Sequence, residues 1–425
     1  MAQAIVPTKS SKAIRAILAI VFSASWIYYS ALCWVFSIKP NPWITGEWLI
    51  NYSAGFQRRG ALGSLTLVLS DFTSLPPTFV AFVMQSSLAA ATLILLFAFL
   101  VKGDTPLPIF LILLGPMGVF YFLTDPAVVG RKELILYAFA LLWLGFLSKS
   151  YEKPLGGARE NLYIVLFTFL LIFAILTHEG FLFFVPILIW ITLTHQGCIT
   201  GKKLPIPWKR LSPFLLSAAA SVPAILLTSS SSVGDGMCQA LIDRGLSSSV
   251  CIGAIDLASS AATESLFIDA VSSAIAPWLI AYFPVFVVLA AILISHLSSQ
   301  NRNFGCGLTP PQRVLSFFGL FLLTTPIYVI AVDWGRYLSL FFTLLAMVLL
   351  FEHQLSSDSN STSASLSGQS LFRSNPTVRL LAILGILSYY LFFGVAHFGG
   401  SYQSLSKSFY EQMLRIFGVL STGVI

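Results

Sequence analysis

Long apolar runs are the feature that most limits what this chain can fold into. Runs of about 17–25 apolar residues recur along its 425 residues, and each is long enough to cross roughly 30 Å of hydrocarbon as a helix. Charged residues make up only 10% of the chain, against about 25% in soluble domains. We therefore predict an all-α, polytopic integral membrane protein that forms a single transmembrane domain over residues 1–425.

About eleven spans are expected. Their predicted limits are 13–38, 78–101, 108–123, 133–147, 162–177, 181–194, 211–228, 271–294, 314–332, 337–351 and 380–396. The apolar run 161–195 is too long for one span, because a single helix would extend roughly 50 Å. The polar sequence "THEG" at 177–180 interrupts it, which favours two short helices with a recessed turn. Irregular backbone at that depth needs protein or water around it, so the turn predicts a cavity.

Lysine and arginine predict the orientation of the chain in the membrane. With the N-terminus in the cytoplasm, the inner connections hold most of the 24 basic residues, and the outer connections hold most of the 17 acidic ones. Treating 161–195 as one helix would place the basic segment "GKKLPIPWKR" (201–210) outside and break this bias. The expected orientation therefore has the N-terminus in the cytoplasm and the C-terminus outside.

The connections are expected to differ between the two sides. Outer loops are predicted at 39–77, 124–132 and 229–270, and a Ser-rich cytoplasmic loop at 353–377. The apolar segment 61–71 is too short to span, which favours an interfacial or re-entrant helix. Helical spacing of apolar residues predicts a second interfacial helix at 402–420 on the outer surface. Cys238 and Cys251 share one outer loop, where an oxidising compartment would allow a disulfide.

Cations in the outer stretches oppose the bias of positive charge toward the cytoplasm. The segment "INYSAGFQRRGALG" (50–63) places two arginines among glycines. Guanidinium groups bind phosphate oxygens through paired hydrogen bonds, and glycine lets the backbone approach such a group closely. We therefore expect a phosphate-bearing ligand, although contact with anionic lipid headgroups or outer carboxylates is the simpler alternative. The expected phosphate-binding residues are Arg58, Arg59, Arg131, Lys132 and Arg336.

Carboxylates in the same stretches supply a second ingredient of a site. Transfer of a sugar to a hydroxyl needs a base, and a partly desolvated carboxyl has its pKa raised toward that task. Glu179 is the first candidate for this base because its turn is expected to be recessed. His178 is its expected partner or an alternative base. A helix-capping role for the His178–Glu179 pair and a local Asp333–Arg336 ion pair remain open alternatives. The expected catalytic residues are Glu179, His178, Glu47 and Asp125, with Glu133 and Asp333 in support.

Other site classes find little support in the sequence. The five cysteines and five histidines have no metal-ligand spacing, so no metal site and no cofactor are expected. A divalent metal bridging phosphate and carboxylate stays open. No segment resembles a nucleic-acid-binding module. The expected partners are membrane lipid, a lipid-linked substrate and other envelope-assembly proteins.

The arrangement resembles bacterial envelope-glycan assembly proteins, namely the polytopic GT-C glycosyltransferases and the O-antigen or capsule polymerases. Both groups act on polyprenyl-phosphate-linked sugars at the outer face of the bacterial inner membrane. GT-C enzymes carry an acidic residue in the first outer loop, where Glu47 stands here. The polymerases use outer-loop arginines, which Arg58, Arg59, Arg131 and Arg336 match. The chain departs from both, because it lacks a paired-acid motif, a large soluble C-terminal domain and one long arginine-rich loop.

The resemblance implies a membrane glycosyltransferase or glycan polymerase, and two other classes remain as alternatives. A transporter or flippase of a lipid-linked or anionic substrate would carry charge in the middle of its spans. The predicted span centres are nearly free of charge, which counts against transport. A non-catalytic membrane subunit of an envelope assembly complex would use the same charged turns to bind a partner protein.

Overall fold

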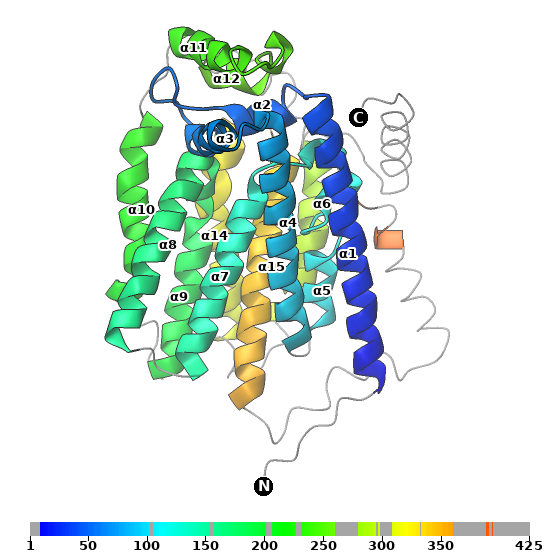
Figure 1. Ribbon diagram of the computed structural model, residues 1–425. Helices are drawn as coiled ribbons and strands as arrows, with labels where there is room; N and C mark the ends of the chain where they lie inside the picture. Colours follow the sequence, from blue (N-terminus) through cyan, green and yellow to red (C-terminus); the bar gives the residue numbers. More distant parts are fainter. Residues whose placement is uncertain are drawn as a thin grey trace.

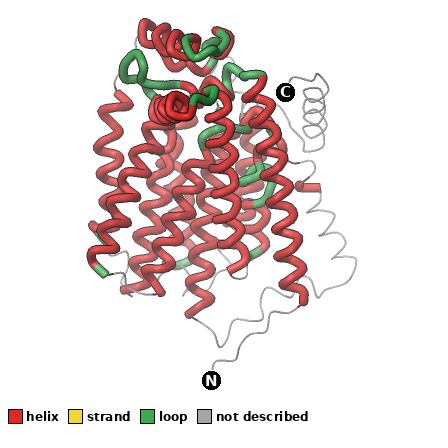
Figure 2. The backbone as a smooth tube through the Cα atoms, in the orientation of Figure 1, coloured by secondary structure: helices red, strands yellow, loops and turns green. Residues whose placement is uncertain are grey.

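The described part of the chain is entirely helical. The computed structural model describes residues 9–102, 105–152, 156–200, 206–226, 231–259, 279–294, 296–297, 308–331, 333–359, 388–390 and 393. All regular secondary structure in these ranges is helix, which confirms the all-α prediction (Figure 2). Six of the described helices are long and apolar enough to cross a membrane. The count of eleven spans and the position of the C-terminus stay predictions.

Long helices packed side by side form the body of the molecule (Figure 1). One helix, α15, lies in the middle, with 89% of its most apolar window buried, against 28% for α1 at the edge. A shorter apolar helix covers Leu279–Ile294. The long helices are α1 (Lys9–Ile38), α4 (Pro77–Lys102), α7 (Glu133–Glu152), α8 (Gly157–Thr177), α9 (Val185–Thr200), α10 (Trp208–Leu226), α14 (Pro310–Ile330) and α15 (Trp334–Ser359).

The segment predicted as a continuous span at 108–123 is broken in the structure. It forms α5 (Leu107–Leu113) and the single turn α6 (Tyr121–Thr124), joined by turns. Pro116 disfavours the helical conformation of the residue before it and removes one backbone donor. A Cβ on Gly118 would lie 2.1 Å from the carbonyl oxygen of Ile112, so the chain folds back on itself there. The segment is apolar as expected, but the prediction of one continuous helix at 108–123 is wrong.

The long apolar run 161–195 is divided as predicted. Helix α8 ends at Thr177, the next residue is extended, and the 3₁₀ helix η2 (Glu179–Phe184) leads into α9. The side chain of His178 accepts a 3.1 Å hydrogen bond from the backbone N–H of Gly180 and so caps η2. The capping alternative for this turn is therefore part of the structure.

Short helices cover one end of the bundle, opposite the end at which α1 begins (Figure 1). They are α2 (Ile44–Leu49), α3 (Gly60–Thr73), α11 (Ser231–Ile242) and α12 (Ala254–Ser259), and they come from the loops predicted at 39–77 and 229–270. A disulfide joins Cys238 on α11 to Cys251 just before α12, with a Cα–Cα distance of 5.7 Å. We call α11, α12 and the segment between them the cap. Its buried Met237 and Leu241 pack with Leu49 of α2.

Helix α3 lies across the bundle end, as expected for an interfacial helix. Its outward side chain Phe72 is 86% exposed. At its start, Gly60 faces the ring of Tyr52, and a Cβ on Gly63 would lie 1.9 Å from the carbonyl oxygen of Ile50. The space left by these glycines is therefore filled by the chain itself. The expectation that they admit a ligand phosphate is not supported by this packing.

Several predicted segments lie outside the described residues. They are the span 380–396, apart from residues 388–390 and 393, the C-terminal helix 402–420, residues 260–278 and most of the Ser-rich loop 353–377. Only the last turns of α15, to Ser359, belong to the described part of that loop.

Replacing Gly63 tests the close packing of α3 against the end of α2. In Gly63→Ala the new methyl group meets a backbone oxygen that cannot rotate away. We expect a loss of about 1–3 kcal/mol in the free energy of unfolding. The matched variant is Gly145→Ala on α7, where a Cβ has nothing within 4 Å. Thermal unfolding in detergent should separate the two variants, and equal melting temperatures would contradict this packing.

Candidate functional site

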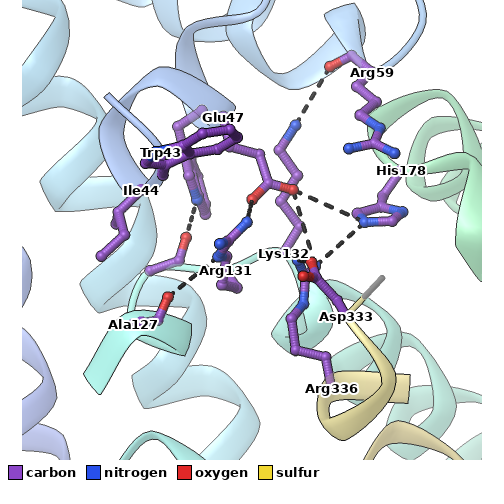
Figure 3. Close-up of polar contacts among 12 residues, drawn as sticks. Trp43, Ile44, Glu47, Arg59, Ala127, Arg131, Lys132, His178, Asp333 and Arg336 are labelled. Carbon is purple, nitrogen blue, oxygen red and sulfur yellow. Dashed lines mark hydrogen bonds and ion pairs between the residues drawn. The ribbon is translucent and has the colours of Figure 1, made fainter. Parts of the chain in front are cut away.

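Charged side chains from distant parts of the sequence meet at the bundle end that α2 and α3 cover (Figure 3). They come from α2, the turn before α3, the turn before α7, the α8–η2 junction and the start of α15. We call this set the charged network. Its members are Glu47, Arg59, Arg131, Lys132, Glu133, His178, Glu179, Asp333 and Arg336. The sequence prediction of one shared group of cations and acids therefore agrees with the structure.

Helix α2 is held on three sides, which fixes the position of its acid. Asn41 caps the first turn through two hydrogen bonds of 2.9 Å. The hydroxyl of Thr45 donates to the last turn of α1 at 3.0 Å. The indole N–H of Trp48 donates to the carbonyl oxygen of Gly130 in the turn before α7. Glu47 lies between these anchors and points into the bundle (Figure 3).

Glu47 is the most enclosed acid of the network, at 1% exposure. Its Oε2 accepts a 2.6 Å bond from Nη1 of Arg131. Its Oε1 has no hydrogen-bond partner, although Nε2 of His178 is 3.8 Å away and Nη2 of Arg336 is 4.0 Å away. Burial alone would raise the pKa of this carboxyl, but Arg131 and Arg336 hold it well below its usual range. Glu47 is therefore an ionised group with one oxygen available.

Arg336 connects α15 to the turn before α7. Its Nε donates to Oε1 of Glu133 at 2.6 Å, and its Nη1 donates to Oδ2 of Asp333 at 2.6 Å. The local Asp333–Arg336 pair expected from the sequence is therefore present, within a larger arrangement. The arginine is nearly inaccessible to solvent. A buried arginine of this kind needs carboxylates around it, and it has them.

Arg59 and Glu179 bind one another closely. Nε of Arg59 lies 2.9 Å from both carboxylate oxygens, and Nη2 lies 2.7 Å from Oε1. Arg59 has a φ of 66°, in the left-handed region, immediately before α3 begins. Glu179, the first candidate base from the sequence, is therefore already bound by Arg59. This pairing favours Glu47 over Glu179 as the available carboxylate.

Lys132 is buried and holds two turns together. Its Nζ donates to the carbonyl oxygen of Thr177 at 3.1 Å and to that of Arg59 at 3.4 Å. Burial lowers the pKa of this amine to about 8, so it stays mostly protonated at neutral pH. Because its bonds go to backbone oxygens, Lys132 stabilises the site and does not reach toward a phosphate.

His178 is neutral and lies between several groups of the network. Burial, followed by the charge of Arg59, lowers the pKa of its imidazole to about 3. Its Nδ1 accepts a hydrogen bond from the backbone N–H of Gly180. Its Nε2 lies 3.3 Å from Nη2 of Arg336 and 3.8 Å from Oε1 of Glu47, the second distance being too long for a hydrogen bond. His178 therefore lies beside the available oxygen without binding it.

Two expected site residues are not among the members of the charged network. Asp125 caps the 3₁₀ helix η1 (Pro126–Val128) by accepting a 3.0 Å bond from the backbone N–H of Ala127. Arg58 is half-buried and makes no hydrogen bond or ion pair with any residue that the structure describes. It is adjacent in sequence to Arg59, so this cation lies next to the network without belonging to it.

The network is electrically balanced. It holds four cations and four carboxylates beside a neutral histidine, so its formal charge is zero.

A cavity of about 40 Å³ lies next to the network, with room for a few water molecules. Within the described ranges, no group of three or more His, Cys, Asp or Glu side chains could hold a metal ion. The cavity is lined by Arg131, Glu133 and Arg336 and by Tyr29, Tyr121 and Tyr137, among others.

Sequence reasoning missed the tyrosines of this cavity. Tyr137 lies one helical turn after Glu133 on α7, a spacing that would have placed both on one face. Tyr29 is inside α1, and only the folded chain brings its hydroxyl to the backbone N–H of Gly130, at 3.2 Å.

No protein-family model matches the chain, and no curated protein or solved structure is significantly similar to it. Function must therefore be inferred from the site.

Removing Arg336 tests whether the network compensates its buried acids. Arg336→Leu leaves three carboxylates without that cation, and we expect a loss of about 3–5 kcal/mol in the free energy of unfolding at neutral pH. Arg58→Leu is the matched control, because Arg58 has no partner among the described residues, and it should cost little.

The same variant should have a characteristic pH dependence. The pKa of Glu47 is depressed in the wild type, so its stabilising contribution persists above its unfolded pKa and is lost only as the pH falls through the lower folded value. Without Arg336 that folded pKa rises, so Arg336→Leu should recover toward the wild type as the pH falls toward about 4. Thermal unfolding of Arg336→Leu and the wild type is measured in neutral and acidic buffers. A loss of stability that does not change with pH would argue against an electrostatic role of Arg336.

Proposed function

We propose that this protein is a membrane glycosyltransferase or glycan polymerase that uses sugars carried on polyprenyl phosphate. The observation that carries the proposal is the buried carboxylate of Glu47, which keeps one unpaired oxygen among Arg131, Arg336 and His178. Transfer from such a donor needs a base for the acceptor hydroxyl and cations for the departing phosphate. The charged network offers both within one small volume.

In the proposed reaction the acceptor oxygen attacks the anomeric carbon of the donor sugar, and the bond from that carbon to the phosphate oxygen breaks. The acceptor proton passes to Oε1 of Glu47, and the lipid phosphate leaves with its negative charge. Arg131 and Arg336 are placed to stabilise that charge as it develops. The imidazole of His178 lies beside that carboxylate, with its Nε2 3.8 Å from Oε1 of Glu47.

Binding of the donor would activate the base. The carboxylate of Glu47 has a depressed pKa and is a weak base while Arg131 is bound to it. A donor phosphate competes for that guanidinium, and the loss of a cation raises the pKa of the carboxyl. Glu47 then becomes a stronger base at the moment when the acceptor must be deprotonated. Substrate binding and activation are thereby linked.

Arg58 is proposed to make the first contact with the phosphate. The network is formally neutral, so an approaching anion gains little from its net charge. Arg58 adds a cation with no carboxylate partner among the described residues, directly beside Arg59. A half-buried guanidinium in this position suits an anionic lipid headgroup.

The proposed location is the outer face of a bacterial inner membrane, with the network on the non-cytoplasmic side. The disulfide of the cap supports this orientation, since such bonds persist in oxidising compartments. Basic residues such as Lys102, Arg159 and Lys209 lie at helix ends away from the network and favour the cytoplasm for that face. Envelope-assembly proteins are the expected partners.

Replacing Glu47 tests the proposed base. Glu47→Gln keeps the size of the side chain and removes its basicity, and we expect sugar transfer to fall by about a hundredfold or more. Transfer from a polyprenyl-phosphate sugar to an acceptor is measured by mass spectrometry with the purified protein in lipid nanodiscs. Glu160→Gln is the control, because Glu160 pairs with Lys209 and Arg210 far from the network. Wild-type transfer by Glu47→Gln would refute the assignment, and counterflow of intact donor without transfer would favour a transporter.

Cysteine labelling tests the proposed orientation. In a background without Cys33, Cys198 and Cys306, Arg58→Cys should react with a membrane-impermeant maleimide on intact cells. Lys209→Cys should react only after the membrane is permeabilised. The opposite pattern would place the network in the cytoplasm.

A further inference from the structure

Helix α15 carries a second buried acid at its far end. Glu352 comes sixteen positions after Arg336, which is roughly 24 Å along the helix. It is 5% exposed, and neither of its carboxyl oxygens has a hydrogen-bond partner. It makes no ion pair with any described residue. This acid plays no part in the charged network or in the proposed transfer.

Two polar neighbours act on Glu352. They are the hydroxyl of Thr194 on α9 and the charge of Arg313 on α14. The hydroxyl of Thr194 also donates to the carbonyl oxygen of Ile191 at 3.1 Å, and Nη2 of Arg313 donates to that of Leu308 at 3.1 Å. A hydroxyl oxygen can accept a hydrogen bond from a carboxylic acid. Because neither carboxyl oxygen of Glu352 has a hydrogen-bond partner, burial favours the neutral carboxyl over the carboxylate.

His195 is one neighbouring group with unused polar atoms. It is 1% exposed, and neither ring nitrogen has a hydrogen-bond partner. Its ring centroid lies 5.8 Å from that of Phe351 and 6.1 Å from that of Tyr151 on α7. The residue pair 194–195 of α9 thus lies against the pair 351–352 of α15, with the hydroxyl of Thr194 toward the acid and the imidazole of His195 toward Phe351.

Other ionisable groups surround this pair. Arg210 of α10 is the charged group that acts on His195, and it also pairs with Glu160 of α8. His296 and His353 lie with their rings 6.4 Å apart, and Arg313 acts on the first of them. An acid, three imidazoles and two arginines therefore gather at the end of the bundle opposite the charged network.

Ionisable side chains at membrane depth are rare because their charge is costly there, and they mark proton relays and ion pathways. We propose that Glu352 is a proton-binding site, in which its carboxyl takes up a proton, donates it to the hydroxyl oxygen of Thr194, and exchanges it with solvent through His195. The step is a simple protonation: a carboxylate oxygen gains a proton from a hydronium ion of the solvent by way of the imidazole, water is left, and the reverse step returns the proton to water. This site does not depend on the proposed glycosyl transfer.

Infrared difference spectroscopy of the full-length protein in nanodiscs tests the site. Spectra recorded between about pH 5 and about pH 9 should contain a carbonyl band of a neutral carboxylic acid that disappears as the pH rises. Glu352→Gln should abolish this band. Thr194→Val should move the band to higher frequency, because the carboxyl loses its acceptor. Glu160→Gln, which removes an ion-paired acid at the same end of the bundle, should leave the band unchanged.

Isotope exchange tests the route. After transfer to deuterated buffer, the isotopic shift of the band should develop at least about tenfold more slowly in His195→Phe, which keeps an aromatic ring and loses the nitrogens. A wild-type spectrum with no titrating carboxyl band would overturn the proposal, and so would a band that survives in Glu352→Gln. An unchanged exchange rate in His195→Phe would exclude the histidine as the route. The wild-type titration decides the first point even if a variant fails to fold.

Discussion

The rest of the structure depends on one requirement: the buried carboxylate of Glu47 must be compensated. An ion removed from water is tolerated only when opposite charges and hydrogen bonds surround it. Here the compensating cations come from the turn before α7 and from the start of α15, while α2 carries the acid itself. Satisfying that single group therefore brings three distant segments together. The same convergence leaves one oxygen unpaired, and that oxygen is the observation that carries the proposed function.

The sequence predicted the elements better than their contacts. Apolar runs predicted the long helices because a membrane admits few other structures, and "THEG" predicted the turn at 177–180. The break at 114–120 was missed, because hydropathy does not register the local effect of Gly-Pro. The residues of the network were predicted as a set, but Glu179 was preferred over Glu47. Which acid is bound by Arg59 depends on tertiary pairing that sequence spacing does not contain.

The two ends of α15 illustrate how burial acts on charge. At one end Arg336 is surrounded by acids, and every member of the charged network has an opposite charge or a backbone partner nearby. At the other end Glu352 is buried and its carboxyl oxygens have no hydrogen-bond partner, so burial favours its neutral form. One helix therefore joins the charged network to the proposed proton-binding site.

A double-mutant cycle between Glu47 and Arg131 tests the central claim most directly. The free energy of unfolding is measured for Glu47→Ala, for Arg131→Ala and for the double variant. If the buried carboxylate depends on its arginine, each single change leaves an unpaired charge, and the double variant is more stable than the sum of the two losses by about 1.5 kcal/mol or more. Losses that add within about 0.5 kcal/mol would contradict the account.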